Sequence, residues 1–287
     1  GHHRRWEISL NVGEDPKAMA TPEGTWKLLA PWLTEQDGTL WRQASYRFHA
    51  LVAQQWRKGR VFVAGDSAHQ QPPFLGQGMC QGVRDAVNLC WRLEAVLKDG
   101  AAESLLDSYG VERKAHVTEL TTRIKGIGKI ITERDVEKAR ARDAKLLSEC
   151  GGVVKPMPRQ DVQPALAVGL LGSVVHPARG TIFPQPLLNH ASGETVRMDD
   201  VYPAGWQVVF NAHVSSDFLR AANHHHLPSL TTLTLGTPAL TEAEGVLAKW
   251  FASHAVKAVI VRPDHYIYGV CHTPEELSTQ LDALKLA

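Results

Sequence analysis

The chain has 287 residues, of which 44% are hydrophobic and 21% are charged, and its 31 Lys and Arg against 30 Asp and Glu leave a formal net charge of +1. A nearly neutral chain has no strong field to attract nucleic acid or an anionic membrane, so neither is expected as a partner. A membrane-spanning helix needs about 18 consecutive apolar residues. The longest stretch of small apolar residues, 165–175, is shorter and contains two glycines. At about 150 residues per domain, the length predicts two domains.

The cysteines and histidines form no metal or redox motif. The four cysteines are scattered and none forms a CxxC pair, which excludes a zinc ribbon and a dithiol site and favours a cytoplasmic location. The three consecutive histidines at 224–226 have no acidic or cysteine partner at ligand spacing. We therefore expect a solvated loop there and no metal site.

The first 50 residues are predicted to contain two extended segments and one short helix. Residues 4–12 alternate as a half-buried strand does, residues 25–33 have a helical pattern, and residues 39–51 are extended. Because a strand is already under way at Arg4, we expect the chain to be the back portion of a longer protein.

A strand, a loop and a helix follow. Residues 59–66 are a short, continuous apolar run, typical of a strand covered on both faces. Residues 67–78 are rich in Pro, Gly and Gln, which indicates a loop. Apolar residues recur at helical spacing over 81–97, and Gly100 ends that helix. Residues 105–148 are predicted to be mostly helical, with a bend at Gly126 and Gly128.

The second half of the chain has the pattern of an α/β unit. A linker is predicted over 151–164, which contains three prolines and two glycines. The order β-α-β-α-β-β-α then describes a compact three-layer unit. Capping boxes are predicted at Thr241 and Thr273. Strands are expected at 206–212, 230–235, 256–262 and 266–271, and helices at 217–223, 241–254 and 274–286.

The segment from 59 to 80 also has the residues for a ligand site. Asp66 lies at the carboxyl end of a predicted strand, where open α/β sheets bind ligands, and it can accept hydrogen bonds from a sugar-like hydroxyl. Pro73 presents a rigid carbonyl. Gly76 and Gly78 lack side chains and precede a helix, whose free N–H groups and dipole favour a partial negative charge. These features predict a site for a polyhydroxyl chain and an electron-rich ring edge.

Taken together, this segment closely resembles the second FAD-binding motif of the flavoprotein aromatic hydroxylases, or class A monooxygenases. The pair Met79-Cys80 and the flanking residues are most similar to 3-(3-hydroxyphenyl)propionate hydroxylases. The resemblance extends from Arg4 to Pro186 and covers nearly the whole chain. It is strongest in residues 59–69, 72–73, 76–79 and 85–93.

The resemblance implies an enzyme that binds FAD. It would use NADH or NADPH and O2 to hydroxylate a phenolic aromatic substrate through a flavin hydroperoxide. Asp66 would bind the ribityl chain of the flavin. The other cofactor-binding candidates are Gly65, Pro73, Gly76, Gly78, Met79 and Cys80, of which the last three would face the pyrimidine edge with their backbone.

Two residues are candidates for lying close to the substrate. The carbonyl of Pro73 would lie within reach of a phenolic hydroxyl, and Arg5 can hold a substrate carboxylate or form a salt bridge in the sheet. No catalytic acid or base is singled out. His69 is expected to make a structural hydrogen bond in the loop, and the choice between NADH and NADPH stays open.

The implied fold class is α/β (α+β): the C-terminal part of an FAD-binding hydroxylase fold, followed by a thioredoxin-like domain without CxxC. That last domain is interpreted as structural or as an oligomer contact, with Cys271 as a buried, inert thiol. The expected divisions are residues 1–50 in the substrate-domain sheet, 51–150 in the FAD-binding domain, 151–175 as a linker and 176–287 as the thioredoxin-like domain.

The sequence departs from the family in one respect. It contains neither the Gly-x-Gly-x-x-Gly fingerprint that opens the first βαβ unit nor the later Asp-Gly segment. An N-terminal companion polypeptide or fragment is therefore expected, because the apolar residues 61–64 would otherwise form an uncovered strand. A truncated, inactive chain, a homo-oligomer, a non-catalytic assembly module and a hydroxylase of polyketide-type aromatics remain alternatives.

Overall fold

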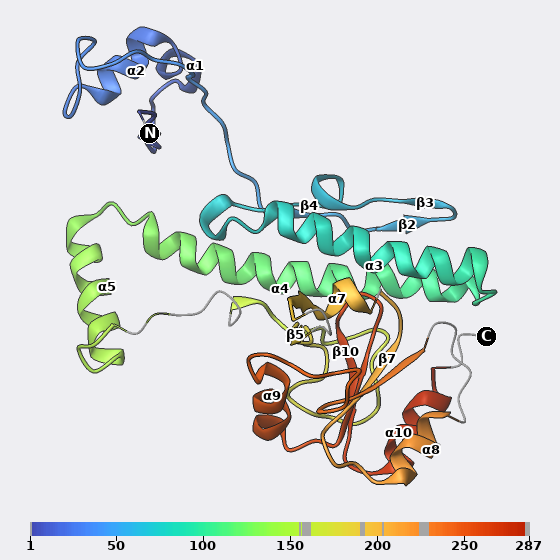
Figure 1. Cartoon of the computed structure of the whole chain (residues 1–287). Helices are drawn as coiled ribbons and strands as arrows, with labels where there is room; N and C mark the ends of the chain where they lie inside the picture. The colour runs from blue at the N-terminus through green and yellow to red at the C-terminus, as the bar shows by residue number, and fades with distance from the viewer. Residues whose placement is uncertain are drawn as a thin grey trace. The chain divides into compact units, whose positions relative to one another are not determined.

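The computed structural model describes residues 2–154, 156, 162–189, 193–202, 204–223 and 230–284. Two units make up the chain, residues 1–49 and residues 50–287, and Figure 1 shows their helices and strands. The histidines at 224–226 lie outside the described residues, so the loop predicted there is not tested.

The unit of residues 1–49 contains two short helices, α1 (Pro16–Met19) and α2 (Pro22–Leu29). Both have a side-chain cap followed by proline: Asp15 accepts a hydrogen bond from the N–H of Lys17, and Thr21 accepts one from Gly24. The helix predicted at 25–33 is therefore confirmed, although it begins and ends earlier.

The strand predicted at residues 4–12 is wrong, and of the extended segment at 39–51 only Leu51 lies in a strand. Apart from Leu51, which pairs with Gln70, neither segment pairs with a strand among the residues that the structure describes. An alternating pattern makes a strand only where a neighbouring strand can bond its backbone N–H and C=O groups.

Two short antiparallel pairs of strands open the second unit. The continuous run at 59–66 contributes only a two-residue strand, and Val61 is 69% exposed. The prediction of a strand covered on both faces is therefore wrong for this structure, because the run pairs only with its hairpin neighbour and then turns at Gly65. The pairs are β1 (Leu51–Val52) with β4 (His69–Gln70), and β2 (Arg57–Lys58) with β3 (Val61–Phe62).

Three helices follow, α3 (Gly78–Lys98), α4 (Asp107–Ile131) and α5 (Val136–Glu149), and α3 packs along α4 (Figure 1). The helix predicted at 81–97 is confirmed. The bend predicted at Gly126 and Gly128 is wrong, since α4 continues through both. Gly128 instead allows a close approach: a Cβ there would lie 2.5 Å from the Phe74 ring. The helical segment breaks later, where Asp135 caps α5.

The last part of the chain forms a four-stranded sheet in the order β10-β9-β7-β8. β7 and β8 are parallel, whereas β9 is antiparallel to both β7 and β10. The predicted order β-α-β-α-β-β-α is confirmed. In chain order the elements are β7 (Gln207–Phe210), α8 (Ser216–Asn223), β8 (Thr231–Thr234), α9 (Val246–His254), β9 (Ala258–Val261), β10 (Ile267–Cys271) and α10 (Pro274–Asp282). They follow a hairpin of β5 (Leu187–Asn189) and β6 (Thr195–Arg197) and the short helix α7 (Met198–Val201).

Helices cover both faces of this sheet. Side chains of α8 and α10 pack with Val208, Phe210 and Ile260 on one face, and side chains of α9 pack with Val209 and Val259 on the other. The central strands β7 and β9 are buried along their whole length. Their continuous apolar sequence is what such double coverage requires. Cys271 is buried as predicted, and burial raises the pKa of its thiol.

Of the two capping boxes predicted, at Thr241 and Thr273, the structure confirms one. Thr273 caps α10 by accepting a hydrogen bond from the N–H of Glu276 at 3.2 Å, as predicted. α9 begins only at Val246, so the capping box predicted at Thr241 is wrong. The carboxylate of Glu242 takes that role and accepts from the N–H groups of Leu247 and Ala248 at 2.7 and 2.9 Å.

Candidate functional site

The predicted cofactor-binding residues lie in two short 3-10 turns and in the first turn of α3. The turns are η1 (Gly65–Ser67) and η2 (Pro73–Leu75). Gly65 has a left-handed φ of +57°, and its Cα approaches Gly82 of α3 so closely that a Cβ on Gly82 would lie 3.4 Å away. The turn that contains Asp66 therefore lies directly against the beginning of α3.

Asp66 is exposed, and the described part of the chain provides no hydrogen-bond partner for its carboxylate. A free carboxylate can accept two or more hydrogen bonds from hydroxyl groups. The arrangement therefore fits a polyhydroxyl ligand at the end of the turn.

The start of α3 offers backbone donors beside this turn. Its N-cap residue, Gln77, makes no capping hydrogen bond with its side chain. The first N–H groups of a helix have no partner within the helix, and the helix dipole makes this end attractive to negative charge. They belong to Gly78, Met79 and Cys80, next to Gly76, which is left-handed at φ +62°. This donor set fits the electron-rich edge of a flavin ring.

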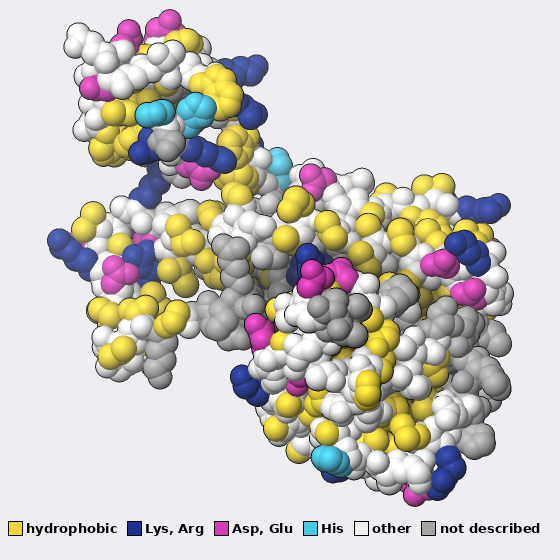
Figure 2. All heavy atoms as spheres, viewed as in Figure 1, with side chains coloured by type: hydrophobic (Ala, Val, Ile, Leu, Met, Phe, Trp, Pro, Cys, Tyr) yellow, Lys and Arg dark blue, Asp and Glu magenta, His cyan; other side chains and the backbone are white. Residues whose placement is uncertain are grey.

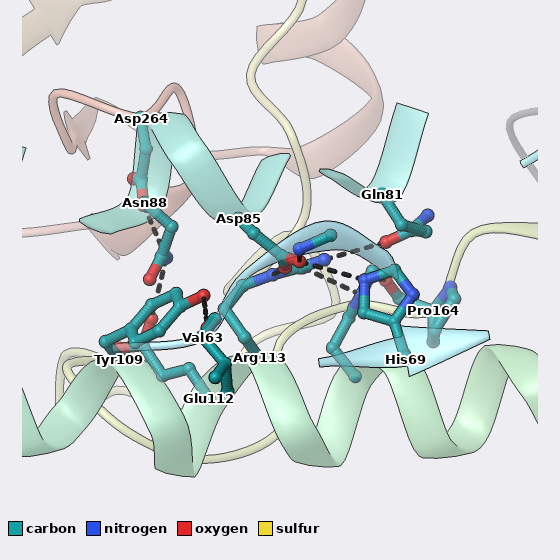
Figure 3. A network of polar contacts seen from close by, with 12 residues as sticks. Val63, His69, Gln81, Asp85, Asn88, Tyr109, Glu112, Arg113, Pro164 and Asp264 are labelled. Carbon is teal, nitrogen blue, oxygen red and sulfur yellow. Dashed lines mark hydrogen bonds and ion pairs between the residues drawn. The ribbon is translucent and has the colours of Figure 1, made fainter. Parts of the chain in front are cut away.

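Beneath the turn lies a buried carboxylate, Asp85, to which the sequence pattern assigned no role of its own. Asp85 of α3 accepts hydrogen bonds from the backbone N–H of Gly65 at 2.9 Å and from Nε2 of His69 at 2.8 Å (Figure 3). Its other oxygen accepts from Nε of Arg113 at 2.8 Å. Burial alone would raise the pKa of Asp85, but the hydrogen bond from His69 and the charge of Arg113 outweigh it and lower that pKa.

Arg113 of α4 extends this network in two further directions. It donates to Oε1 of Gln81 at 2.8 Å and to Nδ1 of His116 at 3.0 Å. Since a guanidinium only donates, the His116 proton is on Nε2, which donates to the carbonyl of Pro164 at 2.9 Å. Burial and the charge of Arg113 lower the pKa of His116 to about 3, so this imidazole is neutral.

His69 has the structural role that was expected. Its side chain is buried, bonds to Asp85 and stacks on Trp56 with ring centroids 5.9 Å apart. Arg5 belongs to the unit of residues 1–49, where its guanidinium forms an exposed pair with Glu7 and donates to the hydroxyl of Tyr46 at 3.3 Å. Its role toward a substrate stays a prediction.

A signal for the missed residues is present in the sequence. Gln81, Asp85, Asn88 and Arg92 are spaced by four, three and four residues, so they share one face of α3, and all four are buried. Polar residues at the spacing of a buried helix face predict a polar partner on the facing element, which here is α4.

The other end of this polar face reaches the C-terminal part of the chain. Nδ2 of Asn88 donates to Asp264 at 2.8 Å, and Arg262 binds Glu112 of α4 at 2.8 and 3.0 Å. Arg92 pairs with the same Glu112 at 2.7 Å. These buried groups join α3 and α4 to the turn between β9 and β10.

Within the described residues, no group of three or more His, Cys, Asp or Glu side chains is arranged to hold a metal ion. The helices described include none with the length and apolarity needed to cross a membrane.

Two parts of the chain match known domain families. Residues 33–124 match the FAD binding domain, and residues 180–287 match the HcaD C-terminal domain. The first match contains every cofactor-binding candidate named above.

Curated relatives extend the match to almost the whole chain. A probable NADH-specific resorcinol 4-hydroxylase from Rhodococcus jostii (strain RHA1) is 35% identical over 96% of this chain and 52% of its own length. A 3-(3-hydroxy-phenyl)propionate/3-hydroxycinnamic acid hydroxylase from Mycobacterium avium (strain 104) is 29% identical over 99% of this chain and 54% of its own length. The chain thus spans about half the length of the curated relatives it matches.

Solved structures show the same fold. Aklavinone-11 hydroxylase, in a complex with FAD and aklavinone, superposes with a TM-score of 0.64 at 23% identity, over 94% of this chain and 52% of the other. The flavin-dependent monooxygenase PieE, with FAD and substrate, gives 0.62 at 21% identity, over 86% and 50%. The chain is therefore similar in sequence to part of curated aromatic hydroxylases and in fold to part of FAD-binding monooxygenases.

Proposed function

We propose that the chain is part of an FAD-dependent monooxygenase that hydroxylates a small phenolic ring with NADH and O2. The observation that carries the proposal is the free carboxylate of Asp66 beside the uncapped start of α3, within a segment that matches the FAD binding domain. The NADH-specific resorcinol 4-hydroxylase among the relatives supports both the nicotinamide cofactor and the phenolic substrate.

The residues of the motif divide the binding of FAD between them. Asp66 would hold the ribityl hydroxyls from the turn that begins at Gly65, and the N–H groups of Gly78, Met79 and Cys80 would stabilise negative charge on the pyrimidine edge. The remaining two candidates, Pro73 and Gly76, would shape the loop beside the ring, and the Pro73 carbonyl accepts a hydrogen bond from the N–H of Gly76 at 2.9 Å. FAD, when bound, supplies the oxidative chemistry, while the chain binds and orients it and excludes water.

Consumption of NADH tests this proposal. The purified protein, loaded with FAD, is expected to oxidise NADH slowly alone and faster with resorcinol or 3-(3-hydroxyphenyl)propionate, with a hydroxylated product detected by mass spectrometry. Asp66→Ala is expected to lose both rates together because it loses FAD. Stimulation by neither phenol, with FAD bound, would contradict the proposed substrate class.

For the C-terminal part, we propose a thioredoxin-like domain without redox activity. The strand order, with one parallel and two antiparallel pairs between helices on both faces, supports this assignment. Its only cysteine from 176 onward, Cys271, is buried and has no second thiol in a CxxC pair. We keep the divisions at residues 50, 150 and 175, together with a cytoplasmic location, as predictions.

We also propose that a further polypeptide covers the outer face of α3. Met79, Val83 and Val87 follow one another at four-residue spacing and are 81, 57 and 40% exposed, and Figure 2 shows hydrophobic side chains on the surface in this region. An exposed apolar stripe of this kind indicates an interaction surface. Because the relatives are about twice as long, the remaining part of such a hydroxylase is the occupant we propose. Co-purification of that part tests it, and a homo-oligomer is the alternative outcome.

The two alternative functions have less support. A non-catalytic assembly module is not favoured, because the curated relatives are named as hydroxylases. A hydroxylase of polyketide-type aromatics is supported only by likeness of fold at under 25% identity.

A further inference from the structure

A buried polar layer lies between α3 and α4. Its members on α3 are spaced by three or four residues, and those on α4 are Glu112, Arg113 and His116. One end of the layer contacts the flavin-motif turn through Asp85, and the other contacts the β9–β10 turn through Glu112 (Figure 3). Each end therefore contains a buried carboxylate, Asp85 beside the Gly65 turn and Asp264 beside Arg262.

We infer that Asp85 is a positioning residue for FAD binding: it fixes the turn from which Asp66 presents its carboxylate. This rests on the proposed function of that turn. Gly65 is the only residue between β3 and Asp66 with a left-handed conformation, and its N–H donates directly to Asp85. A hydrogen bond from a backbone N–H to a buried carboxylate is a strong constraint on the peptide plane that contains it.

The contacts of Asp85 require the charged carboxylate. Three donors point at its two oxygens: the N–H of Gly65, Nε2 of His69 and Nε of Arg113. An asparagine of the same shape has one acceptor oxygen, so its NH2 group must face either Arg113 or the pair of Gly65 and His69. In both orientations a donor faces a donor, and a buried group loses its partner.

The structure provides a matched control at the other end of the layer. Asp264 is also a buried carboxylate that only accepts, from Asn88, Trp91 and Arg262. Its hydrogen-bond partners are none of the residues proposed above to hold FAD. Asp264→Asn therefore has a similar effect on the buried charge without changing the Gly65 turn directly.

Amide hydrogen exchange at Gly65 is the test, with FAD affinity as the second readout. In Asp85→Asn, the Gly65 amide is expected to exchange roughly 10-fold faster or more than in the wild type, and FAD to bind roughly 10-fold more weakly. In Asp264→Asn, both values are expected to stay at the wild-type level while the protein remains folded. Equal changes in the two variants, or no change in either, would overturn the inference.

The two readouts separate this inference from the proposed function. If the wild type binds no FAD, the proposed function fails, whereas Gly65 exchange still decides whether Asp85 holds the turn. If Asp85→Asn does not fold, Arg113→Lys keeps a cation beside Asp85 and is expected to speed Gly65 exchange to a smaller extent. Exchange of Gly65 in the wild type at the rate of an unprotected amide would also overturn the inference.

Discussion

Arg262 connects the β9–β10 turn to both long helices, and its replacement by methionine is expected to lower the free energy of unfolding by about 3–5 kcal/mol. The guanidinium is buried and binds the two oxygens of Glu112 at 2.8 and 3.0 Å. It binds Asp264 at 2.7 and 3.0 Å and donates to the carbonyl of Leu170 at 2.8 Å. Methionine fills part of the volume but provides none of these bonds.

The expected magnitude follows from the charges that remain. Glu112 keeps the guanidinium of Arg92 at 2.7 Å, and Asp264 keeps neutral donors from Asn88 and Trp91 and a more distant contact with Arg92 at 3.8 Å. One buried cation then faces two buried carboxylates, so one negative charge is left uncompensated. Removing one member of a buried pair costs several kcal/mol for this reason, even though forming the pair adds little.

Urea unfolding at pH 7 measures this effect. Lys98→Met is the control, because it removes an exposed pair with Glu94 at the end of α3. We expect that control to leave the midpoint unchanged within error, since exposed pairs contribute little. A loss below about 1 kcal/mol for Arg262→Met would refute the reasoning, because it would mean that water reaches the site and screens the charges.

Two further predictions concern α4. Gly128→Ala is expected to lower the free energy of unfolding by about 1–3 kcal/mol, because the new Cβ would lie 2.5 Å from the Phe74 ring. Gly126→Ala, whose Cβ would meet no atom within 4 Å, is expected to leave that free energy unchanged or to raise it by up to about 1 kcal/mol. Equal urea midpoints for the two variants would contradict this. The pKa of His116 is about 3 in the folded protein, below its value of about 6.5 in the unfolded chain. Between these two pH values the unfolded chain binds more protons than the folded protein, so the free energy of unfolding decreases as the pH falls from about 6.5 towards 3. His116→Gln is expected to lose less unfolding free energy than the wild type between pH 7 and pH 4.5, and an equal loss would contradict the assignment of a neutral imidazole.

The parts of the fold that were predicted correctly are those in which the residue pattern of a single segment is enough to indicate its secondary structure and burial. The apolar runs of β7 and β9 are long enough to indicate coverage on both faces, and the spacing over 81–97 defines α3. The errors occur where a second segment decides the outcome. Val61 has the sequence of a buried strand, but it pairs only with β2. Gly128 accommodates the Phe74 ring within α4, and the sequence alone does not distinguish this from a bend.

In the candidate site, too, the features within one short segment were predicted and those that depend on a second segment were not. Gly65, Asp66 and Gly78 lie within one short segment, so their shared turn and helix start could be recognised locally. The network below them joins Asp85 to Arg113, which is 28 residues later. Its existence depends on how α3 packs on α4, and a single sequence contains no direct information about that pairing.

The binding of FAD at the Asp66 turn is measured by titrating the chain, together with the remaining part of the hydroxylase, with FAD and following the quenching of flavin fluorescence. We expect saturable binding by the wild type and binding at least roughly 10-fold weaker by Asp66→Ala, because the variant lacks the carboxylate proposed to accept hydrogen bonds from the ribityl chain. Equal affinity of the wild type and Asp66→Ala for FAD, measured with the remaining part of the hydroxylase present, would contradict the claim that this turn and the start of α3 hold the flavin.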